Sequence, residues 1–559
     1  MPVSTMFSKA PLRGLFVFVL LLGFTVSSKA GEFAVASAHP AATKAGIEIL
    51  RNGGNAFDAA VTVSAVLAVV EPYSSGMGGG GFWLLHDEKN NKQVMIDGRE
   101  KAPFAAHRDM YLDSQGRFDN SLSIDGALAA GIPGQAAALV HLADNYGQLS
   151  LTQTLRPAIE LARNGFGVDE YYQKMAGWRL AALQDSMAAS EIFLQEDQVP
   201  EKGYLIKQPD LANTLEQLAK QGFDGFYKGP IAEALVRGVR DAGGIWTMED
   251  LAEYKVVERE PVRFSYKDKT ITSAALPSSG GIVMAQILNM LSGYDLEQLD
   301  AVQRIHLVVE TMRRAYRDRA DYLGDSDFID VPVEHLLSKR HAAYLASDIN
   351  LNAASSNDTL VPRSQGMDTT HFSILDKQGN RVSATLSINY PFGSGFVPQT
   401  TGVLLNDEMD DFSASPGEPN VYGLVGSEAN AIEPGKRMLS SMSPTMVEDE
   451  QGIAILGTPG GSRIITMVLL AILEMQKTSD PQAWVDLPRF HHQYLPDVIQ
   501  YEAEAFTKDE LAELESMGHK LKRLENAYGN MHAIYLDRKT GKIRAASDKR
   551  GIGLAIAVD

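Results

Sequence analysis

The sequence contains no cysteine among its 559 residues. Disulfide bonds therefore cannot stabilise it, and a large packed core must hold the chain together. Pro/Ser-rich linkers and internal repeats are also absent, although length alone would predict about three domains. These absences favour one large fold over a string of small domains.

Long hydrophobic runs are scarce as well. The apolar stretch Leu15–Phe24 is much shorter than the ~20 residues that span a bilayer. Lys9 and Arg13 precede it, and Ser28–Ala30 follows with a small-x-small cleavage pattern. We therefore predict a signal peptide over residues 1–30, its removal, and an exported protein, periplasmic or secreted, without a stable membrane anchor.

Basic residues are outnumbered, with 51 Lys and Arg against 70 Asp and Glu, so the formal net charge is −19. Removal of residues 1–30 takes away Lys9, Arg13 and Lys29 but no acid, which moves the charge to −22. An acidic surface argues against nucleic acid or an anionic membrane as a partner.

Three motifs that suggest a bound ion or phosphate each lack a required part. The glycine run Gly78–Gly81 has no following Lys-Ser/Thr and precedes a strand, so it indicates close backbone packing beside a site rather than a P-loop. The acidic run Asn406–Phe412 lacks EF-hand spacing. His491 and His492 would face opposite ways on a strand and have no third ligand nearby. None of the three motifs therefore predicts a bound ion or phosphate, and a structural role is favoured for the two histidines.

Hydrophobic periodicity predicts several helices and a short strand in the first two thirds of the chain. Residues 105–365 have a mostly helical pattern, which suggests scaffold, and Thr247–Asp250 fits a capping box. The predicted helices are His39–Leu50, Asp58–Val70, Leu155–Asn164, Leu211–Gln221, Ile231–Arg240 and Val302–Leu323, and the strand is Val94–Ile96.

The most informative stretch is a predicted hairpin. Thr370–Leu375 is a β-branched and aromatic run, a Gly- and Asn-containing turn follows, and Arg381–Asn389 then alternates polar with apolar residues. We expect one face of the second strand to carry Ser383, Thr385, Ser387 and Asn389. An ordinary half-buried hairpin would have the same pattern.

Thr369 stands just before this hairpin. A threonine at a chain N-terminus can act as a nucleophile with its own α-amine as the base, because that amine has a pKa near 8. The chain would have to break between Asp368 and Thr369, and the neighbouring residues alone do not establish such a break.

Other segments carry groups suited to a site. Arg99 follows a strand, where a guanidinium often binds substrate. Gly457–Arg463 ends a strand with two glycines and opens the apolar helix Ile464–Met475, so its backbone N–H groups suit an oxyanion. The Pro/Gly-rich loop Pro416–Ser427, with Tyr422, is typical of a mobile cover.

Taken together, these segments resemble the γ-glutamyltranspeptidase family. The resemblance runs in order along nearly the whole mature chain, and its motifs are Pro72–Phe82, Asp97–Pro103, Asp368–His371, Asn406–Phe412, Ser440–Thr445, Gly457–Arg463 and Arg489–Gln493.

The resemblance implies an N-terminal nucleophile hydrolase with an α+β fold, a four-layer αββα sandwich. Its precursor would cut itself between Asp368 and Thr369, giving a large subunit, 31–368, and a small catalytic subunit, 369–559, that stay together. No metal or organic cofactor is implied.

By the same resemblance, Thr369 attacks the γ-amide carbonyl of glutathione or another γ-glutamyl compound and forms a γ-glutamyl ester. Water, an amino acid or a peptide then accepts the glutamyl group. The oxyanion would be held by Gly460 and Gly461. The α-carboxylate would be held by Arg99, Ser440 and Ser441. The α-ammonium would be held by Asn389, Glu408 and Asp411. Tyr422 would cover the site.

One position departs from the family pattern, because Ser387 stands where the family usually has threonine. Its hydroxyl would still support the amine of the nucleophile, but it lacks the β-methyl that fixes the rotamer.

Three alternatives remain. A cephalosporin- or glutaryl-type acylase would share the fold and the nucleophile but would not need Glu408 and Asp411. A relative acting on polyglutamate capsules would be obstructed by the loop that contains Tyr422. An exported, unprocessed binding protein would not need Thr369.

Overall fold

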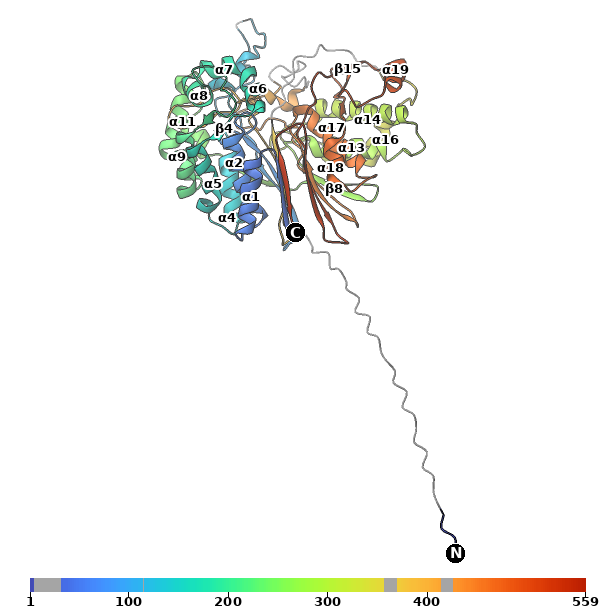
Figure 1. Cartoon of the computed structure of the whole chain (residues 1–559). Coiled ribbons are helices and arrows are strands. Elements are labelled where there is room, and N and C mark those ends of the chain that lie inside the picture. Colours follow the sequence, from blue (N-terminus) through green and yellow to red (C-terminus); the bar gives the residue numbers. More distant parts are fainter. Residues whose placement is uncertain (5–31, 114, 356–368, 414–425) are drawn as a thin grey trace.

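The computed structural model describes residues 1–4, 32–113, 115–355, 369–413 and 426–559. Two β-sheets lie face to face at its centre, and a layer of helices covers the outer face of each (Figure 1). The predicted four-layer αββα sandwich is therefore confirmed.

The first sheet has seven antiparallel strands. In spatial order these are β18 (Leu554–Val558), β1 (Phe33–Ser37), β9 (Thr370–Leu375), β10 (Arg381–Ser387), β2 (Gly80–Asp87), β3 (Lys92–Gly98) and β6 (Val257–Arg259). The predicted strand Thr370–Leu375 is confirmed, and it lies between a strand near the chain start and its hairpin partner.

The second sheet has six antiparallel strands, in the order β17 (Ile543–Ser547), β16 (His532–Asp537), β12 (Gly452–Gly457), β11 (Thr445–Glu448), β8 (Lys269–Ser273) and β7 (Val262–Tyr266). The β7–β8 hairpin lies in the segment that we expected to be mostly helical. Smaller sheets are formed by β13 (Phe490–His491), β14 (Ile499–Tyr501) and β15 (Leu521–Arg523), and by β4 (Phe166–Gly167) and β5 (Leu205–Ile206).

The helices form two separate layers (Figure 1). Beside the first sheet lie α1 (Pro40–Arg51), α2 (Ala56–Val70), α4 (Gln135–Asn145), α5 (Leu151–Asn164), α6 (Glu170–Trp178), α7 (Leu180–Asp185), α8 (Met187–Phe193), α9 (Pro209–Gln221) and α11 (Gly229–Asp241). Beside the second lie α13 (Gly280–Leu291), α14 (Ala301–Tyr322), α16 (Lys339–Ala346), α17 (Ile464–Glu474) and α18 (Pro481–Asp486), with α19 (Lys508–Ser516) at one end.

Helix α2 forms the centre of the first core. All 15 of its residues are buried, and it packs between the first sheet and helices α1, α4 and α5. Asn55 and Asp58 cap its start reciprocally. The capping box predicted at Thr247–Asp250 is also present, at the start of α12 (Met248–Ala252).

The alternation along β10 separates two environments. Val382, Ala384 and Leu386 pack into the core beneath α2. Ser383 faces the second sheet, where its Oγ donates to Leu456 O at 3.0 Å. The row of hydroxyls therefore lies in the buried space between the two sheets, and the alternative of a half-buried hairpin is wrong.

Segments on either side of residue 369 are interleaved in both sheets. β9 pairs with β1, β10 pairs with β2, and β11 pairs with β8. The proposed large and small subunits would thus share one fold. Within the described residues, no helix is long and apolar enough to cross a membrane, and the predicted signal peptide lies almost entirely outside them.

Candidate active site

A small pocket, about 20 Å³, lies where β9 begins and β10 ends. Most of the side chains predicted to form the site line it. They are Arg99, Thr369, Ser387, Asn389, Glu408, Asp411, Ser440, Ser441 and Gly461. Two other predicted residues, Tyr422 and Asp368, lie outside the described residues.

Thr369 directly precedes β9 and is 6% exposed. Its Oγ1 lies 3.5 Å from Ser387 Oγ, and Ser387 Oγ also accepts a hydrogen bond from Asn389 N at 2.8 Å. The next residue, Thr370, donates from Oγ1 to Glu71 Oε2 at 2.8 Å, just past the end of α2. The head of the strand is thus fixed from both sides.

Asn389 differs from the prediction. Strand β10 ends at Ser387, and Asn389 has a positive φ of 73°, so it does not continue the alternating face. Its Nδ2 donates to Asp407 O at 3.0 Å. It lines the pocket because the chain turns there, which asparagine tolerates better than most residues.

The glycine pair follows β12. Gly460 and Gly461 have φ values of 138° and 56°, in the left-handed range that favours glycine. A Cβ on Gly460 would lie 2.5 Å from Met467 Cε. Gly461 opens the short 3-10 helix Gly461–Arg463 that leads into α17, so its N–H lies at a helix start beside the pocket.

Arg99 lies just after β3 and is 1% exposed. Its Nη1 is 2.5 Å from Glu408 Oε2, and its Nη2 is 2.6 Å from Asp411 Oδ2. We predicted that Arg99 and these acids would bind opposite charges of a substrate. In the structure they contact one another.

A third acid, Glu100, also faces Arg99, with its Oε2 3.5 Å from Nη1. Burial raises the pKa of Glu408 to about 7, although Arg99 opposes the shift. Burial likewise raises the pKa of Asp411, and that of Glu100 lies well above its usual value. One guanidinium is therefore shared by three carboxyl groups, of which Glu100 and Glu408 are buried.

The acidic loop is fixed onto the glycine run. Asn406 Nδ2 donates to Gly78 O at 2.6 Å, and its Oδ1 accepts from Glu408 N at 3.0 Å. A Cβ on Gly79 would clash with the carbonyl oxygen of Ser387. The prediction that the glycine run permits close backbone packing beside the site is confirmed.

The sequence reasoning missed two charged residues at the site, Glu100 and Arg319. Glu100 belongs to the Asp97–Pro103 motif, and its place beside Arg99 could have indicated a role. Arg319 lies on α14 among several arginines, and nothing in the local sequence distinguishes it. Four more residues that were not predicted also line the pocket, namely Leu439, Met442, Ser462 and Ile464.

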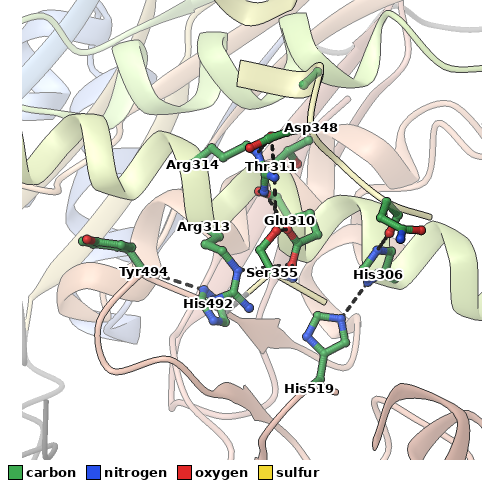
Figure 2. Close-up of polar contacts among 12 residues, drawn as sticks. His306, Glu310, Thr311, Arg313, Arg314, Asp348, Ser355, His492, Tyr494 and His519 are labelled. Carbon is green, nitrogen blue, oxygen red and sulfur yellow. Dashed lines mark hydrogen bonds and ion pairs between the residues drawn. The ribbon is translucent and has the colours of Figure 1, made fainter. Parts of the chain in front are cut away.

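A separate buried cluster could offer three metal ligands: His306, Glu310 and His519 (Figure 2). His306 Nδ1 and His519 Nε2 lie 2.7 Å apart and hydrogen-bond to each other. The Glu310 carboxylate is bound by Arg313 and Arg314 and by the Ser355 hydroxyl. Two guanidinium groups disfavour a cation there, so the cluster is best described as a structural network.

His491 and His492, which we predicted to be structural, are both buried. His491 hydrogen-bonds to Thr466 and Gln493, and His492 Nε2 lies 3.2 Å from Asp497 Oδ1. Protein groups therefore occupy the ring nitrogens that a metal would use.

Comparison with known proteins decides the family. The γ-glutamyltranspeptidase family model matches residues 42–558. The chain belongs to this family. Its relatives include the glutathione hydrolase proenzymes of Escherichia coli and Pseudomonas aeruginosa, each 42% identical over 533 residues. The aligned region covers 94% of this chain in both cases, and 91% and 94% of the two relatives.

Solved structures agree with this γ-glutamyltranspeptidase assignment. Cephalosporin acylase from Bacillus halodurans has a TM-score of 0.83 at 26% identity, covering 99% of this chain and 98% of its own. A chain of Helicobacter pylori γ-glutamyltranspeptidase has a TM-score of 0.56 at 40% identity, covering 57% of this chain and 92% of its own. The first structure matches nearly the whole of this fold, and the second matches part of it.

Proposed function

We propose that this member of the γ-glutamyltranspeptidase family is a glutathione hydrolase and γ-glutamyl transferase that cuts itself before Thr369 and then uses Thr369 as its nucleophile. The observation that carries the proposal is the position of Thr369, which lies at the head of a buried strand beside a pocket containing both guanidinium and carboxylate groups. The names of the relatives, which are glutathione hydrolase proenzymes, support it.

The ion pairs of the pocket suit an α-amino acid. A γ-glutamyl group carries an α-carboxylate and an α-ammonium on one carbon. These two charges can replace the direct Arg99–Asp411 contact, because the carboxylate gives the arginine a new partner and the ammonium does the same for the acid. We assign the carboxylate end to Arg99, Ser440 and Ser441, and the ammonium end to Asn389, Glu408 and Asp411.

Self-cleavage would begin with attack of Thr369 Oγ1 on the carbonyl carbon of Asp368. The peptide C–N bond then breaks, leaving an ester on Oγ1 and a free α-amine on Thr369, and water hydrolyses the ester. The side-chain hydroxyl of Ser387 lies 3.5 Å from Oγ1. This hydroxyl is placed to accept a hydrogen bond while Oγ1 attacks.

In the mature enzyme the α-amine of Thr369 takes the proton from Oγ1 as this atom attacks the γ-carbonyl carbon of glutathione. The oxyanion is held by the N–H groups of Gly460 and Gly461. Collapse of the intermediate breaks the γ-amide bond, and cysteinylglycine leaves with the proton. Water or an acceptor amine then attacks the γ-glutamyl ester and frees Thr369.

The acylase alternative is less well supported. A glutaryl group has no α-ammonium, so it would leave Glu408 and Asp411 buried without a cationic ligand of the substrate. We further propose that the protein is exported.

The decisive experiment is N-terminal sequencing. The purified mature protein should give two pieces on a denaturing gel, of 338 and 191 residues, and the smaller should begin Thr-Thr-His-Phe. Any other N-terminus would refute the assignment of Thr369.

Two variants of Thr369 complete the test. Thr369→Ala should remain one uncut, inactive chain, because the same hydroxyl performs both steps. Thr369→Ser should keep part of each activity, since Oγ is retained. A processed and active alanine variant would overturn the mechanism.

A further inference from the structure

A second arginine, Arg319, reaches the same pocket from α14. It is 5% exposed, and the partners of its guanidinium are hydroxyl groups. Nε donates to Ser279 Oγ at 3.0 Å and Nη2 donates to Ser441 Oγ at 3.3 Å. Across the part of the chain that the structure describes, Arg319 forms no ion pair with a carboxylate.

The two arginines of the pocket therefore differ in charge compensation. Burial lowers the pKa of Arg99, but Glu408, Glu100 and Asp411 outweigh this effect and raise it above the ordinary value. Burial also lowers the pKa of Arg319, and Tyr316 and Asp411 offset this only in part. Both groups stay protonated at neutral pH. The charge of Arg99 is cancelled by its neighbours, whereas that of Arg319 is not.

Arg319 also determines how the nearby hydroxyls are oriented. A guanidinium has only donors, so Ser441 Oγ must accept from it, and the Ser441 hydrogen remains available for another acceptor. Ser279 accepts from Arg319 in the same way and donates its own hydrogen to Ser440 O at 2.8 Å. Ser440 Oγ accepts from Met442 N at 3.1 Å, so its hydrogen is available too.

The pocket thus has one end at which two serine hydrogens and an uncompensated positive charge come together. An anion is the ligand that matches such a set of donors. We propose that Arg319 makes this end of the pocket selective for an α-carboxylate, by supplying the uncompensated charge and by orienting Ser441 as a donor. This inference rests on the proposed γ-glutamyl activity and assigns to Arg319 a specificity role, distinct from the nucleophile and the oxyanion groups.

The test uses two anilide substrates that differ only in the carboxylate. One is a γ-glutamyl anilide, and the other is a 4-aminobutyryl anilide, which keeps the amine and lacks the α-carboxylate. Arg319→Gln removes the charge but keeps an N–H donor, and Arg319→Lys keeps the charge. Arg317→Gln removes an exposed charge from the same helix and serves as the matched control.

For Arg319→Gln we expect kcat/KM on the γ-glutamyl anilide to fall about 10- to 100-fold, the range for a lost hydrogen-bonding contribution to a charged group. The loss should lie mainly in KM, because the carboxylate is bound in both ground and transition states. The 4-aminobutyryl anilide should be a poor substrate for the parent and be little affected by the change. Arg319→Lys should recover part of the loss, and Arg317→Gln should behave as the parent.

An equal fall for both anilides, carried by kcat, would show that Arg319 only supports the fold, and would overturn the inference. If Arg319→Gln is not processed, Ser279→Ala provides the test, because it removes a partner of Arg319 without changing a residue that lines the pocket. Ser279→Ala should lower the ratio of kcat/KM for the γ-glutamyl anilide to kcat/KM for the 4-aminobutyryl anilide. An unchanged ratio would refute the inference. Failure of the parent to cleave the γ-glutamyl anilide would instead refute the proposed function.

Discussion

Asp411 offers the sharpest test of substrate class. Its carboxylate lies 2.6 Å from Arg99 Nη2, and its side chain is only 14% exposed. In the proposed complex this carboxylate receives the α-ammonium of the substrate. Asp411→Asn keeps the side-chain shape and removes the negative charge, so it tests whether the acid binds a cation.

The expected magnitude follows from the burial of the pair. Removing one partner of a desolvated, hydrogen-bonded charge pair costs roughly 2–5 kcal/mol, or about thirty- to several-thousand-fold. We therefore expect kcat/KM for a γ-glutamyl anilide to fall by a factor in this range. A glutaryl anilide, which lacks only the α-amine, should be poor with the parent enzyme and little affected by the change.

Asp410→Asn is the matched control. Asp410 belongs to the same 3-10 helix, Glu408–Asp411, but its Oδ1 accepts from Ser123 Oγ at 2.6 Å and it does not line the pocket. Asp410→Asn should change the stability of the fold more than it changes the selectivity between the two anilides. If Asp411→Asn lowered both anilides equally, Asp411 would be structural and the preference for a glutamyl group would have another origin.

Two further predictions concern single side chains. Ser387→Thr should still be processed, as measured on a denaturing gel. It should raise turnover by up to about fivefold, because the β-methyl restricts the hydroxyl rotamer. A large loss of processing would show that the pocket is packed around serine. Burial lowers the pKa of His519 to about 3, so the unfolded chain binds more protons than the folded one between pH 3 and 6.5. Stability should then be complete above pH 6.5 and decrease as the pH falls. His519→Gln should reduce the slope of the unfolding free energy against pH by up to about 1.4 kcal/mol per pH unit. The slope is measured by urea unfolding at several pH values, with the exposed His107→Gln as control. An unchanged slope would contradict the reasoning.

Local patterns predicted the parts of the fold that local chemistry determines. The strand Thr370–Leu375 and the helix α5, predicted as Leu155–Asn164, were recognised because hydrophobic periodicity and end signals agree there. The strand over Arg381–Asn389 was predicted two residues too long. The alternation of polar and apolar residues continues in the sequence to Asn389, but β10 ends at Ser387 and Asn389 has a positive φ. The β7–β8 hairpin was missed, although Val262–Ser273 alternates around a Lys-Asp turn.

The site shows the limit of this reasoning more clearly. Arg99 could be found because it belongs to a short motif, and so could the glycine pair. Arg319 comes from the middle of a long helix, and its role depends on which hydroxyls lie opposite it, a tertiary fact that no local pattern records. The same holds for the direct Arg99–Asp411 contact, which joins residues 312 positions apart.

The interleaved sheets bear on when the proposed self-cleavage can occur. Thr369 lies at the pocket only because β9 is paired with β1 on one side and with β10 on the other. Arg99 is brought there by β3 through its pairing with β2. All of these pairings must exist before Ser387 and Arg99 lie beside Thr369, so cutting has to follow assembly of the first sheet.

After the sheet has assembled, a break before Thr369 removes none of the strand pairings, since β9 keeps both neighbours. Either subunit alone would instead expose strand edges that are paired in the whole protein, such as those of β2 and β8, and unpaired edges of this kind favour aggregation. The two subunits should therefore form and remain as a pair.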